Sequence, residues 1–210
     1  MEVNFYYLFC VFAVTLGSMI LHEIMHGVVA LWQGDQTAKL SGRLSLNPLK
    51  HIDPVMTIIV PLSLALMGAP IFGGAKPVPI NTRNLRHAEA SFALVAIAGP
   101  LTNFILAFIF FLLYSFVSNT GNLGLLFVVG IEVNLGFMLF NLIPIPPLDG
   151  SRVLYFLAPD FVREFMLKLE GTAGMIVIYV LIFISGGLLG SYMSGASNLI
   201  LDFFKLITGQ

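Results

Sequence analysis

Charged residues are scarce in this sequence. Asp, Glu, Lys and Arg together make up 10% of its 210 residues, against about 25% in a typical soluble domain. With 58% hydrophobic residues and a mean hydropathy of +0.94, the chain is predicted to be an integral membrane protein. No stretch is polar enough for a separate soluble unit, so we expect residues 1–210 to form a single membrane-embedded domain.

Cysteine and net charge exclude two further classes. Cys10 is the only cysteine, so the chain cannot form an internal disulfide. The formal net charge of −1 is too balanced to indicate binding to nucleic acid.

Long apolar stretches dominate what is present. Four of them could cross about 30 Å of hydrocarbon as helices: residues 5–31, 91–117, 123–143 and 172–189. The stretch 54–72 differs, because Pro61 at its centre interrupts helical hydrogen bonding and a turn-rich segment follows. Residues 38–47, AKLSGRLSLN, alternate partly between apolar and polar, which predicts a short strand or hairpin.

The distribution of basic residues predicts the topology. Nine of the ten Lys and Arg fall in three segments, which the positive-inside rule places in the cytoplasm: Lys39, Arg43 and Lys50; Lys76, Arg83 and Arg86; Arg152, Arg163 and Lys168. A full crossing by residues 54–72 would separate the first two segments, so we expect a re-entrant or interfacial segment there. The predicted fold is an all-α polytopic membrane protein with about four full spans, that segment and a short membrane-associated β element. The tail after Leu189 is a return crossing or a surface helix, and its amphipathic end favours the latter.

The motif LHEIMHG, residues 21–27, places three ionisable side chains in the first apolar stretch, where each charge costs roughly 2.5–3.5 kcal/mol. His22 and His26 are four residues apart, so a helix presents both on one face, where they could bind one metal ion. Glu23 lies about 100° around the helix from His22, which suits a general base beside the metal. The alternative is two histidines that only bond to neighbouring helices, but H-E-x-x-H arises by chance in roughly one chain of this length in a hundred.

A catalytic zinc site usually needs a third protein ligand. His51 and His87 lie in polar, basic segments and are interpreted as solvated surface side chains. Asp149 follows a span that runs toward the same side as the histidine pair, whereas Glu132 should lie about 20 Å farther out. Asp149 is therefore the predicted third ligand, and an ordinary Asp-Gly turn is the alternative.

Three motifs together resemble the site-2 protease family of intramembrane zinc metalloproteases: HEIMH (22–26), AGPLTN (98–103) and NLIPIPPLDG (141–150). Two further segments resemble its short prokaryotic branch: GRLSLNPLKHIDP and GGAKPVPINTRNLR. The resemblance runs from about residue 17 to 155, and no interval has room for the PDZ or CBS domains that relatives carry. It implies one Zn²⁺ per chain bound by His22, His26 and Asp149, with Glu23 as the base and a β element that docks substrate.

Three asparagines are candidates for binding substrate or stabilising an oxyanion: Asn47, Asn103 and Asn141. Asn134 and Asn141 share one face of their helix, where they either line a wet cavity or bond between helices.

The expected function is that of a zinc metalloendopeptidase that cuts peptide bonds in or near transmembrane segments, so residues 1–210 would be a peptidase domain. We expect a multi-pass protein of the cell membrane with its active site toward the cytoplasm. Its expected partners are a transmembrane protein substrate and the lipid bilayer, without nucleic acid; a regulatory partner or a homo-oligomer is left open. The alternative is a metal ion transporter or channel, disfavoured because the chain has no internal repeat and its His/Asp cluster lies toward one side.

Overall fold

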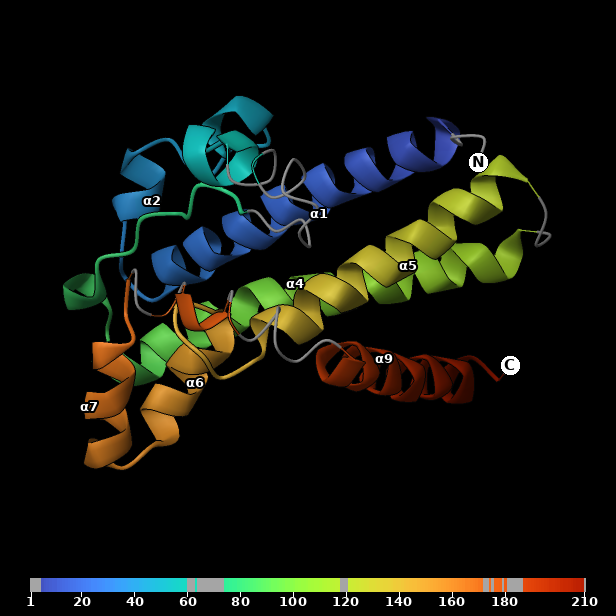
Figure 1. The fold of residues 1–210 in the computed structure, drawn as a ribbon. Helices are drawn as coiled ribbons and strands as arrows, with labels where there is room; N and C mark the ends of the chain where they lie inside the picture. The colour runs from blue at the N-terminus through green and yellow to red at the C-terminus, as the bar shows by residue number, and fades with distance from the viewer. Residues whose placement is uncertain are drawn as a thin grey trace.

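Three long helices form the body of the protein. The structure, a computed structural model, describes residues 5–59, 63, 74–117, 121–171, 174, 176–178, 180 and 187–209. Within them, three helices are long and apolar enough to cross a membrane: α1 (Phe5–Trp32), α4 (Ala88–Phe116) and α5 (Asn122–Asn141). They pack against one another side by side (Figure 1) and correspond to the first three predicted spans. Of the fourth, 172–189, the structure describes only residues 174, 176–178, 180 and 187–189, so this predicted span lies largely outside the described residues.

Further elements lie between and after these three helices. They are α2 (Thr37–Leu40), the 3₁₀ turns η1 (Pro48–Lys50) and η3 (Thr82–Asn84), the π-helical turn η2 (Pro54–Ile59), α6 (Asp149–Leu157), α7 (Asp160–Lys168) and α9 (Gly187–Thr208). Of the predicted re-entrant segment 54–72, only η2 and residue 63 are described.

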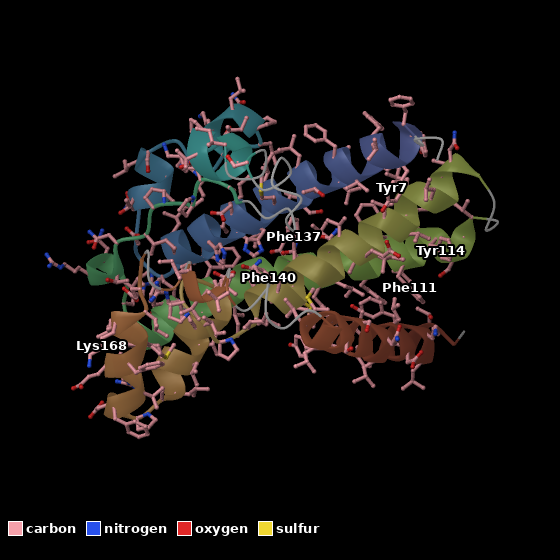
Figure 2. The ribbon with its side chains drawn as sticks, in the orientation of Figure 1. Tyr7, Phe111, Tyr114, Phe137, Phe140 and Lys168 are labelled. Carbon is pink, nitrogen blue, oxygen red and sulfur yellow. The ribbon has the colours of Figure 1, made fainter. Side chains whose placement is uncertain are left out.

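The two ends of the helical bundle differ in composition. Helices α2, α6 and α7 gather at one end of α1, α4 and α5, and the N-terminus lies at the other (Figure 1). Lys168 marks the first end, whereas Tyr7 and Tyr114 lie toward the second (Figure 2). Because α2, α6 and α7 carry residues of the first and third basic segments, the fold groups these segments as the sequence predicts. We call this end the basic end.

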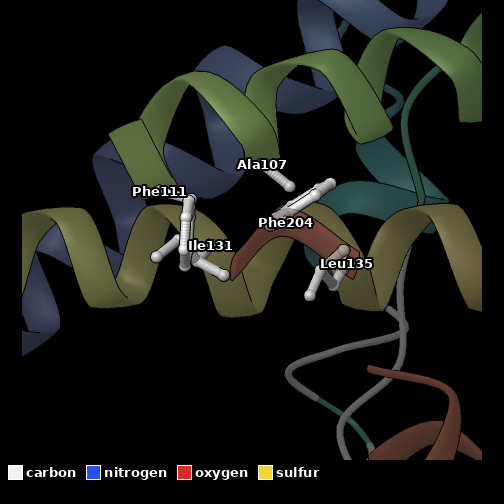
Figure 3. Packing of buried hydrophobic residues seen from close by; sticks show 5 residues of the cluster. All are labelled: Ala107, Phe111, Ile131, Leu135 and Phe204. Atoms are coloured by element: carbon white, nitrogen blue, oxygen red, sulfur yellow. The ribbon is translucent and has the colours of Figure 1, made fainter. Parts of the chain in front are cut away.

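Helix α9 packs against the flank of α4 and α5. Its Phe204 is fully buried among Ala107 and Phe111 of α4 and Ile131 and Leu135 of α5 (Figure 3). The Phe204 ring also stacks at an angle on Phe104, with ring centroids 5.3 Å apart. The tail helix therefore runs alongside the long helices instead of lying apart from them.

The prediction of a strand or hairpin at residues 38–47 is wrong. Helix α2 occupies the first part of this segment, and residues 41–47 are irregular. The backbone amides of Ser41, Gly42 and Arg43 donate back to carbonyls of residues 37–39, so local bonds satisfy groups that a β ladder would need. Gly42 has a φ of +63°, the left-handed conformation that commonly ends a helix. The described residues contain no strand at all.

Candidate metal centre

Helix α1 positions the two histidines of the motif. Because His22 and His26 are one turn apart, both imidazoles leave the same face of α1, and both are buried. Their Nε2 atoms are 3.0 Å apart. The rings stand almost perpendicular, at 88°, with centroids 4.6 Å apart. The two Nε2 atoms therefore converge on one point between α1 and α4.

Asp149 reaches the same point from the start of α6. Its Oδ2 atom lies 3.2 Å from His22 Nε2 and 3.4 Å from His26 Nε2. The next residue must be small, because a Cβ at Gly150 would lie 2.2 Å from the Leu142 carbonyl oxygen. A glycine there lets α6 begin close against the end of α5, which brings the Asp149 carboxylate to the histidines.

The three donor atoms have the spacing of zinc ligands. In tetrahedral zinc sites with bonds of about 2.0–2.1 Å, ligand atoms lie about 3.3–3.4 Å apart, since a tetrahedral edge is about 1.63 times the bond length. The observed separations of 3.0, 3.2 and 3.4 Å are close to this value. A zinc ion held by these three residues would keep a position for water or substrate, as in catalytic zinc sites.

Hydrogen bonds orient the histidine ring nitrogens. Asn134 Nδ2 donates to the Gly130 carbonyl at 2.8 Å, so its Oδ1 accepts from Asn103 Nδ2 at 2.9 Å. Asn103 Oδ1 then faces His22 Nδ1 at 2.6 Å and accepts its proton. His26 Nδ1 similarly donates to the Val95 carbonyl at 2.7 Å. With both protons on Nδ1, each Nε2 presents a lone pair, as metal ligation requires.

The cluster is therefore electron-rich and attracts positive charge. Two imidazole lone pairs and one carboxylate oxygen face one another, and Asp149 Oδ2 is buried without a hydrogen-bond donor in the described part of the chain. These groups together attract positive charge. The same attraction acts on a metal ion, so these residues fit zinc.

Gly99 on α4 makes room for the cluster. A Cβ at this position would lie 2.5 Å from His22 Nε2, His22 Cε1 and His26 Nε2. Any larger residue would enter the space where the ligand atoms meet. Sequence reasoning assigned no role to Gly99, although it lies inside the AGPLTN motif.

Glu23 points toward a different neighbour. Its Oε2 atom accepts a hydrogen bond of 2.8 Å from the backbone amide of Val78. Glu23 is not among the donor atoms that converge on the metal position, as expected for a residue about 100° around α1 from His22. Nothing in the sequence pattern indicated Val78 as its partner.

The three candidate asparagines lie in different places. Asn103 is buried and bonds to His22, as described above. Asn47 is exposed and its Oδ1 caps η1 by accepting from the Leu49 amide at 3.1 Å. Asn141 Nδ2 donates to the Phe137 carbonyl of its own helix at 3.0 Å. The sequence left open whether Asn134 and Asn141 line a wet cavity or bond between helices. Asn134 does the latter, because it bonds to Asn103 of α4.

Three other candidates lie outside the cluster. The interpretation of His51 as a solvated side chain is wrong: His51 is fully buried, and its Nε2 bonds to the Ser45 carbonyl at 2.7 Å. His87 is exposed, as expected. Glu132 is also exposed and lies two residues from Asn134, which places it about 200° around α5 from the face that meets α4.

Relatives of this chain carry the name "Putative zinc metalloprotease" followed by their own designations. YwhC of Bacillus subtilis is 40% identical over 185 residues, which cover 84% of this chain and 80% of YwhC. Rip2 of Mycolicibacterium smegmatis is 34% identical over 144 residues, 66% of this chain and 53% of Rip2, so this match spans about half of that relative. MJ0611 of Methanocaldococcus jannaschii is 45% identical over 60 residues, 29% of this chain and 31% of MJ0611. No family model and no solved structure matches the chain.

Proposed function

Because this chain belongs to the site-2 protease family of zinc metalloproteases, we propose that it hydrolyses peptide bonds in or near transmembrane segments of membrane protein substrates. The observation that carries the proposal is that Asp149 meets His22 and His26, with ligand-like spacing, against a helix long and apolar enough to cross a membrane. A soluble metalloprotease has no need to build its site on such helices. Residues 1–210 act as one membrane-embedded peptidase domain.

The proposed chemistry divides between the metal and Glu23. Zinc bound by His22, His26 and Asp149 supplies Lewis-acid polarisation of the scissile carbonyl and makes water a nucleophile near neutral pH. Glu23 accepts the proton that the attacking water loses as its oxygen bonds to the carbonyl carbon. Glu23 then gives this proton to the amine nitrogen as the carbon–nitrogen bond breaks. The protein enters and leaves the cycle unchanged.

Asn103 supports the chemistry by orienting His22. It is buried and both ends of its amide are occupied, one by His22 and the other by Asn134. Asn103 has no exposed surface, so its amide does not face a substrate. We therefore assign Asn103 to holding the ligand, and keep Asn141 as the candidate for substrate contact.

The position of the site suggests where substrates are cut. Val95 and Gly99, which border the cluster, lie in the first half of α4, near the end that begins at Ala88. This is the basic end, which the positive-inside rule places in the cytoplasm. We propose that substrates are cleaved toward the cytoplasmic ends of their transmembrane segments, in the cell membrane. A helical substrate must first unwind there, because its amides are otherwise held in its own hydrogen bonds.

Glu23→Gln is the decisive variant. It keeps the shape of the side chain but cannot take a proton, so we expect full zinc content and a loss of cleavage of about 10²–10⁴-fold. Fluorescein-labelled casein serves as an unstructured probe, and mass spectrometry of membrane fragments identifies native substrates. Glu132→Gln is the matched control, because this glutamate faces away from α4.

Two results would contradict the proposal. Wild-type cleavage by Glu23→Gln would remove the assigned base. Zinc flux into vesicles that is the same for wild type and Glu23→Gln, without any cleavage, would favour the transporter.

A further inference from the structure

Residues 74–81, which form neither helix nor strand, cross the face of α1 that carries Glu23. Val78 lies at its centre, is buried, and donates its backbone amide to Glu23 Oε2 at 2.8 Å. One turn farther along α1, Gly27 permits this close approach, since a Cβ there would lie 3.2 Å from Val78 Cγ1. The segment therefore rests directly on α1 beside the metal cluster.

Other parts of the chain hold this segment in place at both ends. The Lys76 amide donates to the His51 carbonyl at 2.9 Å, and the Arg43 guanidinium donates to the Lys76 carbonyl. The Asn81 amide donates to Asp35 Oδ2 at 2.7 Å. None of these bonds involves Glu23, so the position of Val78 does not depend on the glutamate.

Two prolines prepare the Val78 amide for this contact. Pro77 and Pro79 flank Val78, and a residue before proline is restricted to extended conformations. Extended residues alternate in direction, so the amides of Lys76 and Val78 point to the same side, toward the protein. Because proline has no N–H, Val78 supplies the only backbone donor between residues 77 and 79.

We propose that the Val78 amide is a positioning group for Glu23. It holds one carboxylate oxygen, Oε2, and thereby aims the other oxygen at the water that attacks the substrate. The bond leaves Oε1 free to accept a proton. This inference rests on the proposed function, in which Glu23 is the base.

Hydrogen–deuterium exchange tests the bond without any activity measurement. Within residues 77–79 the only exchangeable backbone amide is that of Val78, because both neighbours are prolines, so overlapping peptides that differ by this stretch report on it. Glu23→Ala removes the acceptor, and we expect this amide to exchange about 10- to 100-fold faster, as for the loss of a hydrogen bond to a charged group. An unchanged exchange rate would overturn the proposal.

Val78→Pro tests the role in catalysis. Val78 already precedes a proline, so an extended proline is tolerated there, and the substitution removes the donor. We expect kcat for casein to fall about 10- to 100-fold with KM little changed. Zinc affinity should stay within about threefold, because no ligand bond is lost. Ala75→Pro is the matched control: it places a proline in the same segment but keeps the Val78 amide, and should retain kcat within about threefold.

The double variant separates positioning from mere structural support. If the amide acts through Glu23, Val78→Pro should change the residual rate of Glu23→Gln by less than about twofold. If Val78→Pro lowered the cleavage rate equally in the wild-type and Glu23→Gln backgrounds, the role of the amide would be structural. If Val78→Pro cleaved faster, the amide would mask the base. Either result overturns the proposal. Wild-type cleavage by Glu23→Gln would instead contradict the proposed function, and the exchange experiment would still report on the bond.

Discussion

A single methyl group at Gly99 should weaken zinc binding by orders of magnitude. In Gly99→Ala the new Cβ would lie 2.5 Å from both Nε2 atoms of the histidine pair, whereas ordinary contact begins at 3.4 Å. The imidazoles would have to retreat by about 0.9 Å, several times the deviation of about 0.2 Å that metal sites tolerate. At least one histidine should therefore leave the metal.

The magnitude follows from the energy of zinc binding. Four-ligand zinc sites bind with about 10–16 kcal/mol, or about 2.5–4 kcal/mol per ligand. Loss of one imidazole should weaken zinc binding by about 10²–10³-fold. Helix α4 itself should persist, because alanine favours helix over glycine by about 1 kcal/mol.

Competition with a chromophoric chelator measures the zinc affinity. Gly17→Ala is the matched control, since it makes the same change in α1 at a position where nothing lies within 4 Å of the new Cβ. This control should bind zinc as the wild type does. Zinc affinity of Gly99→Ala within about threefold of wild type would refute the assignment of these histidines as ligands.

Three further predictions concern residues around the site. Asn134→Ala leaves Asn103 without its partner, and zinc affinity measured by chelator competition should fall about 10-fold, as for other outer-sphere substitutions. Glu132→Leu should retain full zinc content by elemental analysis, because Glu132 faces away from the cluster; loss of zinc would place it in the site. Asp35 accepts bonds from Thr37, Asn81 and Asn84, which outweigh burial and lower its pKa below 3.8. The ionised Asp35 carboxylate should contribute about 1–3 kcal/mol to the free energy of unfolding. This contribution should be present above pH 3.8 and lost as pH falls through the lowered pKa. The difference in urea midpoint between wild type and Asp35→Asn should therefore shrink at low pH, and a constant difference would contradict this.

The wrong strand prediction has a local cause. Alternation of apolar residues at 40, 44 and 46 is compatible with a strand, but a strand exists only if another segment pairs with it. Here the chain closes a helical turn at Thr37–Leu40 and bonds back on itself. Periodicity reports which side chains prefer burial, and it does not report where backbone amides find acceptors.

The buried His51 shows the same limit for a polar residue. Its neighbours Lys50 and Asp53 made the segment resemble a surface loop. In the structure the side chain turns inward to the Ser45 carbonyl, and the His51 carbonyl accepts the Lys76 amide. A polar side chain can be buried where a hydrogen-bond partner is available. The sequence around His51 does not show which group will be that partner.

The sequence by itself determined the features that local geometry sets. The spacing of His22 and His26 places them on one face of a helix whatever surrounds that helix, and long apolar runs predict the helices α1, α4 and α5. Tertiary structure alone decided which distant groups meet: Asn103 with His22 across 81 positions, and Val78 with Glu23 across 55. The physical reason is that helical periodicity follows from backbone geometry within a few residues, whereas a hydrogen bond between distant residues exists only after packing brings donor and acceptor within about 3 Å.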